Sequence, residues 1–236
     1  MWFGRQDNRM SYFNFFGKKL VLSIAILLLA KWLPFSFAIT IDKLQAAFSQ
    51  KYGASALPNF TSWVNLIDAV KDSKSDEKIK RVNEFFNRKI LWSDDQKIWG
   101  QLDYWATPLE TIGRATGDCE DFAIAKYFTL ISSGIPVSKL RLVYVKAKNG
   151  NTPNGGTADQ AHMVMAYYPS PDAEPMILDN LITEIRPASR RPDLEPVFSF
   201  NSEGVYAGAG GKEDQSASRL SRWQDLLQRT KVEGFD

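Results

Sequence analysis

The segment DCEDFAIAKYFTLIS, residues 118–132, is the most informative part of this 236-residue chain. After its acidic first turn, apolar side chains occur on most sides of a helical projection, which is typical of a helix buried in a core. Gly134 and Pro136 follow it, and both residue types commonly end helices. We therefore predict a central buried helix over residues 118–132.

On the N-terminal side of this segment, apolar residues recur every three or four positions. This spacing predicts amphipathic helices over residues 42–52 and 59–70, and a third helix that begins at Ser75. Residues 93–117 show no sustained periodicity and contain several glycines and Pro108. We expect them to form a long loop, and long loops in compact domains are often functional.

On the C-terminal side the apolar pattern changes to a period of two. We predict strands over residues 140–145, 161–168, 176–179 and 197–200, and a C-terminal helix at about 216–231. Helices followed by antiparallel strands indicate an α+β fold with a helical lobe over about 39–135 and a sheet lobe over about 136–205.

The first forty residues differ from the rest of the chain. A basic start is followed by an apolar run from Leu20 to Ala30 and then by Ser36-Phe37-Ala38, a typical cleavage site. We expect residues 1–38 to be an export signal and residues 39–236 to be the mature domain. The alternative is an uncleaved membrane anchor, although Lys31 and Pro34 end the run well short of the roughly 18 apolar residues that a spanning helix needs.

Removal of the signal changes the charge of the protein. Residues 1–38 carry five Lys or Arg residues and one Asp, so the formal net charge falls from +2 to −2. No basic excess remains to neutralise phosphates, which argues against a nucleic-acid partner.

The chain contains one cysteine, Cys119, and one histidine, His162. This scarcity excludes an intramolecular disulfide and zinc sites built from several cysteines and histidines. Any chemistry that combines a thiol with an imidazole must use this one pair.

Cys119 lies in the first turn of the predicted central helix, with Asp118 as a plausible cap and Gly117 allowing close approach of a substrate or backbone. Free N–H groups at a helix start stabilise a thiolate and can also bind an oxyanion. The neighbouring carboxylates oppose this effect, because negative charge raises the pKa of a thiol. A bound cation would remove the conflict, and the alternative is a small cysteine that only packs.

His162 and Asp179 lie on two strands that a turn-rich connector joins into a predicted hairpin. If the turn is centred on Ser170 and Pro171, His162 faces Asp179 directly, within reach of a hydrogen bond from the imidazole. Together with Cys119, they form the nucleophile, base and orienting acid of papain-like chemistry.

Three sequence blocks resemble a known family. Gly117-Asp118-Cys119-Glu120-Asp121-Phe122-Ala123, Ala161-His162-Met163-Val164 and Leu178-Asp179-Asn180 resemble bacterial transglutaminase-like cysteine proteinases of the LapG type, in the transglutaminase-like branch of the papain-type proteases. The resemblance extends from about residue 39 to the strand near Phe200.

The resemblance implies a calcium-dependent periplasmic endoprotease that cuts a large surface adhesin near its N-terminus and so releases cells from a biofilm. It also implies sequestration by an inner-membrane receptor for cyclic di-GMP. Cys119 would be the nucleophile, His162 the general base and acid, and Asp179 the residue that fixes the imidazole. The calcium ligands would be Asp118 and Glu120, with Asp121 from the same turn and Asp103 from the preceding loop.

Calcium also has a rationale in the residues themselves, because Ca²⁺ prefers several oxygen ligands and acidic side chains are concentrated beside Cys119. Two other functions stay open at this point. One is acyl transfer to an amine by a transglutaminase-like enzyme, and the other is a non-catalytic protein that binds in a calcium-dependent way.

Overall fold

We describe residues 41–149, 158–209, 213–215 and 220–235 of a computed structural model of the chain. The predicted export signal, residues 1–38, lies outside the described residues, as do residues 216–219 at the start of the predicted terminal helix. No helix within the described residues combines the length and apolar character needed to cross a membrane.

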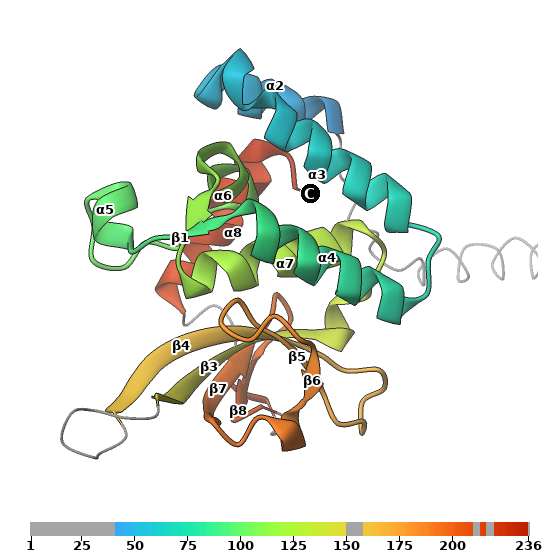
Figure 1. Cartoon of the computed structure of the whole chain (residues 1–236), viewed down its shortest axis with the longest axis vertical. Coiled ribbons are helices and arrows are strands. Elements are labelled where there is room, and N and C mark those ends of the chain that lie inside the picture. Colours follow the sequence, from blue (N-terminus) through green and yellow to red (C-terminus); the bar gives the residue numbers. More distant parts are fainter. Residues whose placement is uncertain (1–40, 150–157, 210–212, 216–219, 236) are drawn as a thin grey trace, which may run out of the picture. The chain divides into compact units, whose positions relative to one another are not determined.

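A layer of helices covers one face of an antiparallel sheet (Figure 1). The longer helices are α2 (Ile41–Tyr52), α3 (Leu57–Val70), α4 (Ser75–Lys89), α6 (Pro108–Arg114), α7 (Cys119–Ser132) and α8 (Ser221–Glu233). The shorter ones are η2 (Ala54–Ala56), α5 (Asp95–Trp99), η3 (Val137–Lys139) and η4 (Ala188–Arg190). The helices predicted before residue 90, the central helix and the terminal helix are thus confirmed as α2, α3, α4, α7 and α8.

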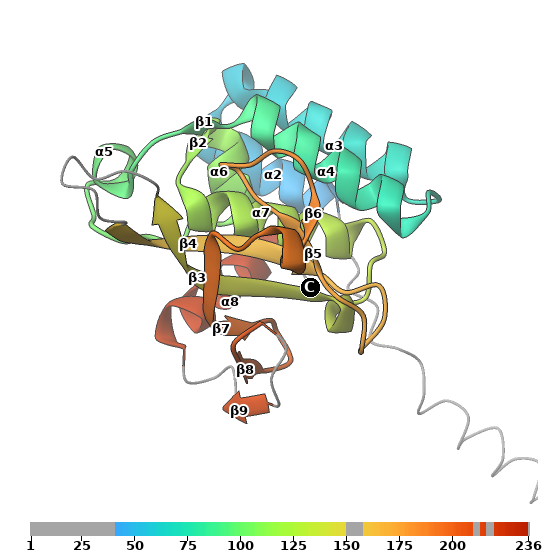
Figure 2. The same cartoon turned by 60° about the horizontal axis from the view of Figure 1, so that its bottom comes forward.

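The sheet has the strand order β6-β5-β4-β3-β7-β8-β9, and each neighbouring pair is antiparallel. Its strands are β3 (Leu140–Asn149), β4 (Ala158–Tyr167), β5 (Met176–Leu178), β6 (Arg186–Pro187), β7 (Leu194–Phe200), β8 (Val205–Ala207) and β9 (Glu213–Gln215). In Figure 2 the long strands β3 and β4 run beneath helices α3, α4 and α7. The predicted α+β class is confirmed.

Helix α7 occupies the centre of the core. Every residue from Asp121 to Ile131 is buried, and the helix contacts α4 and α6 on one side and strands β3 and β4 on the other. It ends at Ser132, and Gly134 just beyond it has a left-handed φ of 89°, while the Ile135 N–H donates to the Leu130 carbonyl. This arrangement satisfies the last helical carbonyls and turns the chain into the sheet.

Residues 93–117 are more ordered than we predicted. They contain α5, α6 and the short strand β2 (Thr116–Gly117), which pairs in parallel with β1 (Leu91–Trp92). Helix α6 begins with a capping box, in which Thr107 and Glu110 each accept a hydrogen bond from the other's backbone N–H. The prediction of a continuous loop was therefore wrong, because it overlooked the Thr107-Pro108-Leu109-Glu110 helix-start pattern.

The hairpin of β4 and β5 forms, but its register differs from the prediction by two residues. Met165 pairs with Leu178, because the Ala173 N–H donates to the Ser170 carbonyl and centres the turn between Pro171 and Asp172. Asp179 consequently lies one residue beyond the end of β5 and is not directly opposite His162. Since side chains alternate with a period of two, a shift of two residues keeps both on the same face.

Candidate active site

The site is built around the first turn of α7. Backbone pairing of Trp92 with Gly117 fixes the chain just before the helix, and the Ser93 N–H adds a bond of 3.1 Å to the Gly117 carbonyl. A Cβ atom at Gly117 would lie 2.7 Å from the Cβ atom of Asp121. The close approach that glycine permits here is thus to a side chain of α7 itself.

Cys119 is partly exposed at the helix start. Its thiol donates a hydrogen bond of 2.7 Å to Glu120 Oε2. Burial raises the pKa of this thiol strongly, and the negative charges of Glu120 and Asp118 raise it further, whereas the Met163 backbone N–H acts in the opposite direction. In these surroundings the thiol holds its proton at neutral pH.

His162 is buried on β4, and its Nε2 atom lies 2.9 Å from Asp179 Oδ1. Burial alone would raise the pKa of Asp179, but hydrogen bonds from His162, the Leu181 N–H and Arg191 lower it to about 2. Asp179 is therefore an anion that fixes one nitrogen of the imidazole. Nδ1 is the ring nitrogen left for other partners.

Cys119 and His162 line the same cleft, which has a volume of about 790 Å³. Tyr144, Phe198 and Trp105 supply aromatic surface to it, and the Tyr144 and Phe198 rings stack with centroids 5.3 Å apart. The described residues show no hydrogen bond between the thiol and the imidazole. Three exposed apolar side chains also line the cleft, namely Trp92, Leu102 and Leu181.

A cluster of carboxylates lies beside the thiol. Asp95, Asp118 and Asp121 place one oxygen each within 4.8 Å of one another, and each has a buried oxygen without a hydrogen-bond partner: Asp95 Oδ1, Asp118 Oδ1 and Asp121 Oδ2. Burial and mutual repulsion raise the pKa of Asp118 to about 9 and that of Asp95 to about 6, and the pKa of Asp121 is also well above its usual value. We call these three residues the acidic cluster.

The four predicted metal ligands fall into different, overlapping groups of side chains. Asp118 and Asp121 belong to the acidic cluster, while Glu120 and Asp103 form a second group with Asp95. Asp103 is also ion-paired with Arg222 at 3.0 Å. Asp118 occupies the N-cap position, as expected, but its side chain makes no capping hydrogen bond. One buried oxygen of each carboxylate in the cluster thus lacks a partner and is available to a divalent cation.

Asp95 was missed by the sequence analysis, although it belongs to two of the carboxylate groups. Its sequence context, Asp94-Asp95 before a short helix, is typical of a solvent-exposed helix start, and Asp94 does cap α5 by accepting from the Lys97 N–H. Asp95, however, is only 2% exposed. Only the folded structure shows that the Asp95 side chain belongs to the cluster.

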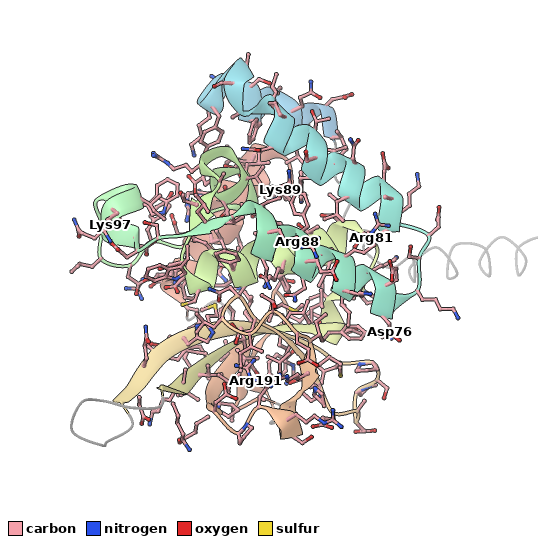
Figure 3. The ribbon with its side chains drawn as sticks, in the orientation of Figure 1. Asp76, Arg81, Arg88, Lys89, Lys97 and Arg191 are labelled. Atoms are coloured by element: carbon pink, nitrogen blue, oxygen red, sulfur yellow. The ribbon has the colours of Figure 1, made fainter. Side chains whose placement is uncertain are left out.

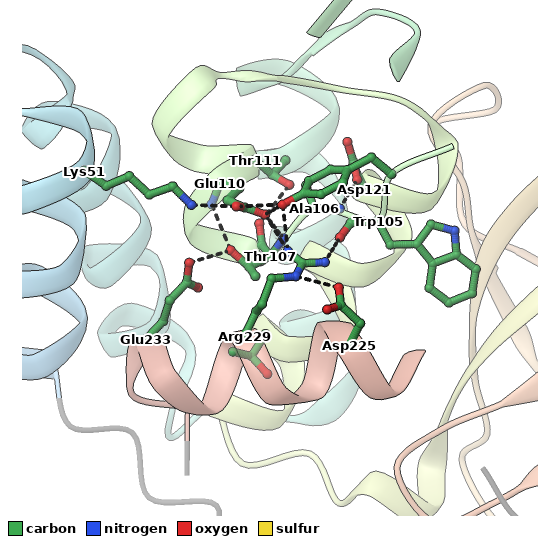
Figure 4. Close-up of polar contacts among 12 residues, drawn as sticks. Lys51, Trp105, Ala106, Thr107, Glu110, Thr111, Asp121, Asp225, Arg229 and Glu233 are labelled. Carbon is green, nitrogen blue, oxygen red and sulfur yellow. Dashed lines mark hydrogen bonds and ion pairs between the residues drawn. The ribbon is translucent and has the colours of Figure 1, made fainter. Parts of the chain in front are cut away.

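The segment Tyr104–Ala106 connects the cluster to a second polar network (Figure 4). The Tyr104 N–H donates to Asp95 Oδ2, and the Ala106 N–H donates to Asp121 Oδ1 at 2.8 Å. Between them, the Trp105 carbonyl accepts from Arg229 at 2.6 Å. Helix α8 therefore helps to hold the loop that carries part of the site.

Residues 62–192 match the family described as bacterial transglutaminase-like cysteine proteinase (BTLCP). The match spans more than half of the chain and includes Cys119, His162 and Asp179. The chain belongs to this family. It is thus a transglutaminase-like cysteine proteinase by descent, and its fold agrees with solved structures of such a proteinase.

This proteinase is similar to Legionella pneumophila LapG in three structures, each covering 81% of the chain. The EGTA-treated form is 39% identical, with a TM-score of 0.69 and 97% of its own chain covered. The calcium-bound form is 40% identical, with a TM-score of 0.67 and 99% covered. None of the curated proteins compared with the chain matches it.

Proposed function

We propose that this proteinase is a calcium-dependent endoprotease with Cys119 as nucleophile, His162 as general base and acid, and Asp179 as the residue that orients His162. The observation that carries the proposal is that the lone cysteine, at the start of a buried helix, shares a cleft with the lone histidine, whose Nε2 is held by a buried carboxylate. Nucleophile, base and orienting acid are the parts that thiol proteolysis requires.

The reaction follows from these positions. His162 takes the thiol proton at Nδ1, and Cys119 Sγ attacks the carbonyl carbon of the substrate. The imidazolium returns the proton to the leaving amine as the C–N bond breaks, which leaves a thioester. Water, deprotonated by His162, then hydrolyses the thioester to a carboxylate and restores the thiol. Backbone N–H groups at the start of α7 can stabilise the oxyanion in both steps.

The residues of the acidic cluster fit calcium. Three buried carboxylate oxygens lack partners, and burial, followed by repulsion between the like charges, raises the pKa values of the three carboxyl groups. Asp95, Asp118 and Asp121 would hold the ion, with Glu120 and Asp103 at its side. When bound, calcium would offset the negative charge that now raises the pKa of the Cys119 thiol. The likeness to a calcium-bound LapG structure supports this assignment.

The proposed substrate is a large surface adhesin cut near its N-terminus, and the proposed regulator is the periplasmic domain of an inner-membrane cyclic di-GMP receptor. The proposed location is the periplasm. The family membership and the signal-like sequence of residues 1–38 support these assignments. Exposed apolar side chains along the cleft, Trp92, Leu102 and Leu181, offer surface to a peptide chain.

The experiment incubates the purified protein with an N-terminal fragment of a large adhesin, with calcium or with a chelator. We expect one cleavage that calcium supports and the chelator stops. Cys119→Ala should abolish cleavage, while Ser132→Ala, at the other end of the same helix, should leave it unchanged. Persistent cleavage by Cys119→Ala would overturn the proposal.

Two further readouts separate the other functions. Incorporation of an amine into a glutamine peptide would indicate acyl transfer instead of hydrolysis. A Cys119 thiol that does not react with iodoacetamide in the presence of calcium would indicate a binding protein without catalysis, because only a thiolate reacts rapidly.

A further inference from the structure

Asp179 is held by more than its histidine. Its side chain is fully buried, and while Oδ1 accepts from His162 Nε2 and from the Leu181 N–H at 3.0 Å, Oδ2 accepts from Arg191 Nη2 at 2.8 Å. Arg191 follows η4 and lies in the sheet layer of Figure 3. Its side chain is only 2% exposed. A buried guanidinium therefore lies directly behind the carboxylate.

Arg191 is itself held in place from the other side. Nη2 also contacts Asp193 Oδ2 at 2.7 Å, and Nε donates to Asp193 Oδ1 at 3.0 Å. The side chain of Asp193 is 36% exposed and makes the outer end of this chain of ion pairs. The fork geometry of arginine allows it to bind two carboxylates at once with fixed direction.

The other polar side chains near Asp179 cannot take the place of Arg191. Lys126 on α7 interacts electrostatically with Asp179, but burial lowers the pKa of Lys126 to about 7, so its charge varies near neutral pH. Its Nζ lies 5.7 Å from the Phe122 ring centroid. Asn87 on α4 donates to the Asp179 backbone carbonyl and carries no charge. An arginine side chain, by contrast, stays charged in proteins.

We propose that Arg191 is a positioning residue for the active site: it fixes the direction and charge of the Asp179 carboxylate, so that Oδ1 holds His162 Nε2 and Nδ1 stays available to the thiol. The inference rests on the proposed function. Arg191 does not line the cleft that holds Cys119 and His162, so it acts through Asp179.

The experiment compares Arg191→Met and Arg191→Lys with the unaltered protein, and uses Arg186→Met as a matched control. Arg186 belongs to an exposed ion pair with Glu184 on the adjacent strand β6. Two quantities are measured in calcium across pH: kcat and KM for adhesin cleavage, and the rate of Cys119 alkylation by iodoacetamide. Circular dichroism and thermal unfolding identify variants that do not fold.

We expect Arg191→Met to lower kcat by about 10- to 100-fold with little change in KM, because a misplaced base slows the chemistry more than binding. Loss of a fixed positive charge should also move both limbs of the alkylation profile to higher pH, by roughly half a unit or more. Other charged groups also influence this profile. Lys126 acts on Asp179, Asp193 acts on Arg191, and Glu120 and Asp118 act on Cys119. Arg191→Lys should keep the limbs in place and lower only the rate, and Arg186→Met should change neither.

The outcomes are distinct. A lower rate for Arg191→Met at every pH, with unmoved limbs, would show a merely structural role and overturn the inference. If Arg191→Met does not fold, Arg191→Lys decides, since unchanged kcat in that variant would equally overturn it. If the unaltered protein shows neither cleavage nor a reactive thiol, the proposed function itself fails.

Discussion

Two groups of buried carboxylates lie on either side of the segment Tyr104–Ala106, and they differ in whether cationic side chains pair with them. Glu110, on α6, is almost fully buried and accepts from Lys51 at 2.6 Å, from Arg229 at 2.8 Å and from the Thr107 N–H at 2.9 Å. Figure 4 shows these contacts converging from helices α2, α6 and α8. Its charge is neutralised entirely within the chain.

The acidic cluster accepts backbone hydrogen bonds from Tyr104 and Ala106 but lacks a cationic partner among the residues that the structure describes. Within the described residues Asp95, Asp118 and Asp121 form no ion pair, and each retains a buried oxygen without a hydrogen bond. A buried ion pair is strongly destabilised when one partner is removed, and carboxylates confined together without cations repel one another. The comparison agrees with a structural role for Glu110 and with the proposed calcium-binding role of the cluster.

The largest expected effect comes from the cluster. Asp121→Asn keeps the shape of the side chain but removes one negative charge, so we expect calcium-supported cleavage to fall by about 100-fold or more at a fixed calcium concentration. A calcium titration of the cleavage rate measures this effect. An unchanged calcium midpoint would contradict the assignment of the cluster.

The second test makes the corresponding change, from carboxylate to amide, at Glu110. Glu110→Gln leaves Lys51 and Arg229 without their buried partner, and we expect it to lower the free energy of unfolding by about 3 kcal/mol. Urea unfolding in chelator measures the change. The exposed Asp68→Asn, which breaks a surface pair with Lys71, should cost under about 1 kcal/mol. The calcium midpoint of Glu110→Gln should not move. A large shift would contradict the assignment of separate roles to Glu110 and the acidic cluster.

Calcium should also stabilise the fold. An ion at about 100 times its Kd adds roughly 2.7 kcal/mol, which corresponds to an increase in Tm of about 5 to 10 °C for a domain of this size. Asp95→Asn should reduce this increase and, because it relieves repulsion, should raise the Tm in chelator. Thermal unfolding with and without calcium measures both quantities. A lower Tm for Asp95→Asn in chelator would show that the cluster is not under charge repulsion.

The smallest expected effect concerns Glu233, which interacts with Glu110 and, like the residues of the acidic cluster, has a buried oxygen without a partner. Glu233 Oε1 accepts from Thr107, but Oε2 is buried without a partner, and burial raises the pKa of Glu233 to about 7. The folded state therefore binds more protons than the unfolded state between pH 4.5 and 7, so stability falls as pH rises through this range and the loss persists above it. Glu233→Gln should be more stable than the unaltered protein by about 1 to 2 kcal/mol at pH 8 and equal to it near pH 4. A difference that is independent of pH in urea unfolding would assign the effect to packing.

The sequence was most informative where the signal is local. The all-round apolar pattern of residues 118–132 predicted α7 to within one residue, because a helix surrounded by core on every side has no polar face to obscure it. The same pattern placed Cys119 in the first turn. The capping box at Thr107 is equally local, and a search for it would have found α6.

The contact between His162 and Asp179 was predicted through an incorrect register. The turn is displaced by one position, yet the two side chains meet at 2.9 Å, since a shift of two residues preserves the face of each strand. The prediction succeeded because alternation tolerates such an error, and a shift of one residue would have separated them.

The sequence by itself determined the α+β order, the central helix and the identity of the one thiol and the one imidazole, because local periodicity and residue scarcity need no knowledge of distant contacts. Only the tertiary structure decided that Asp95 joins Asp118 and Asp121, and that Arg191 lies behind Asp179. These contacts join segments without regular pattern, and whether a carboxylate is solvated, paired or confined with like charges depends on what surrounds it in space.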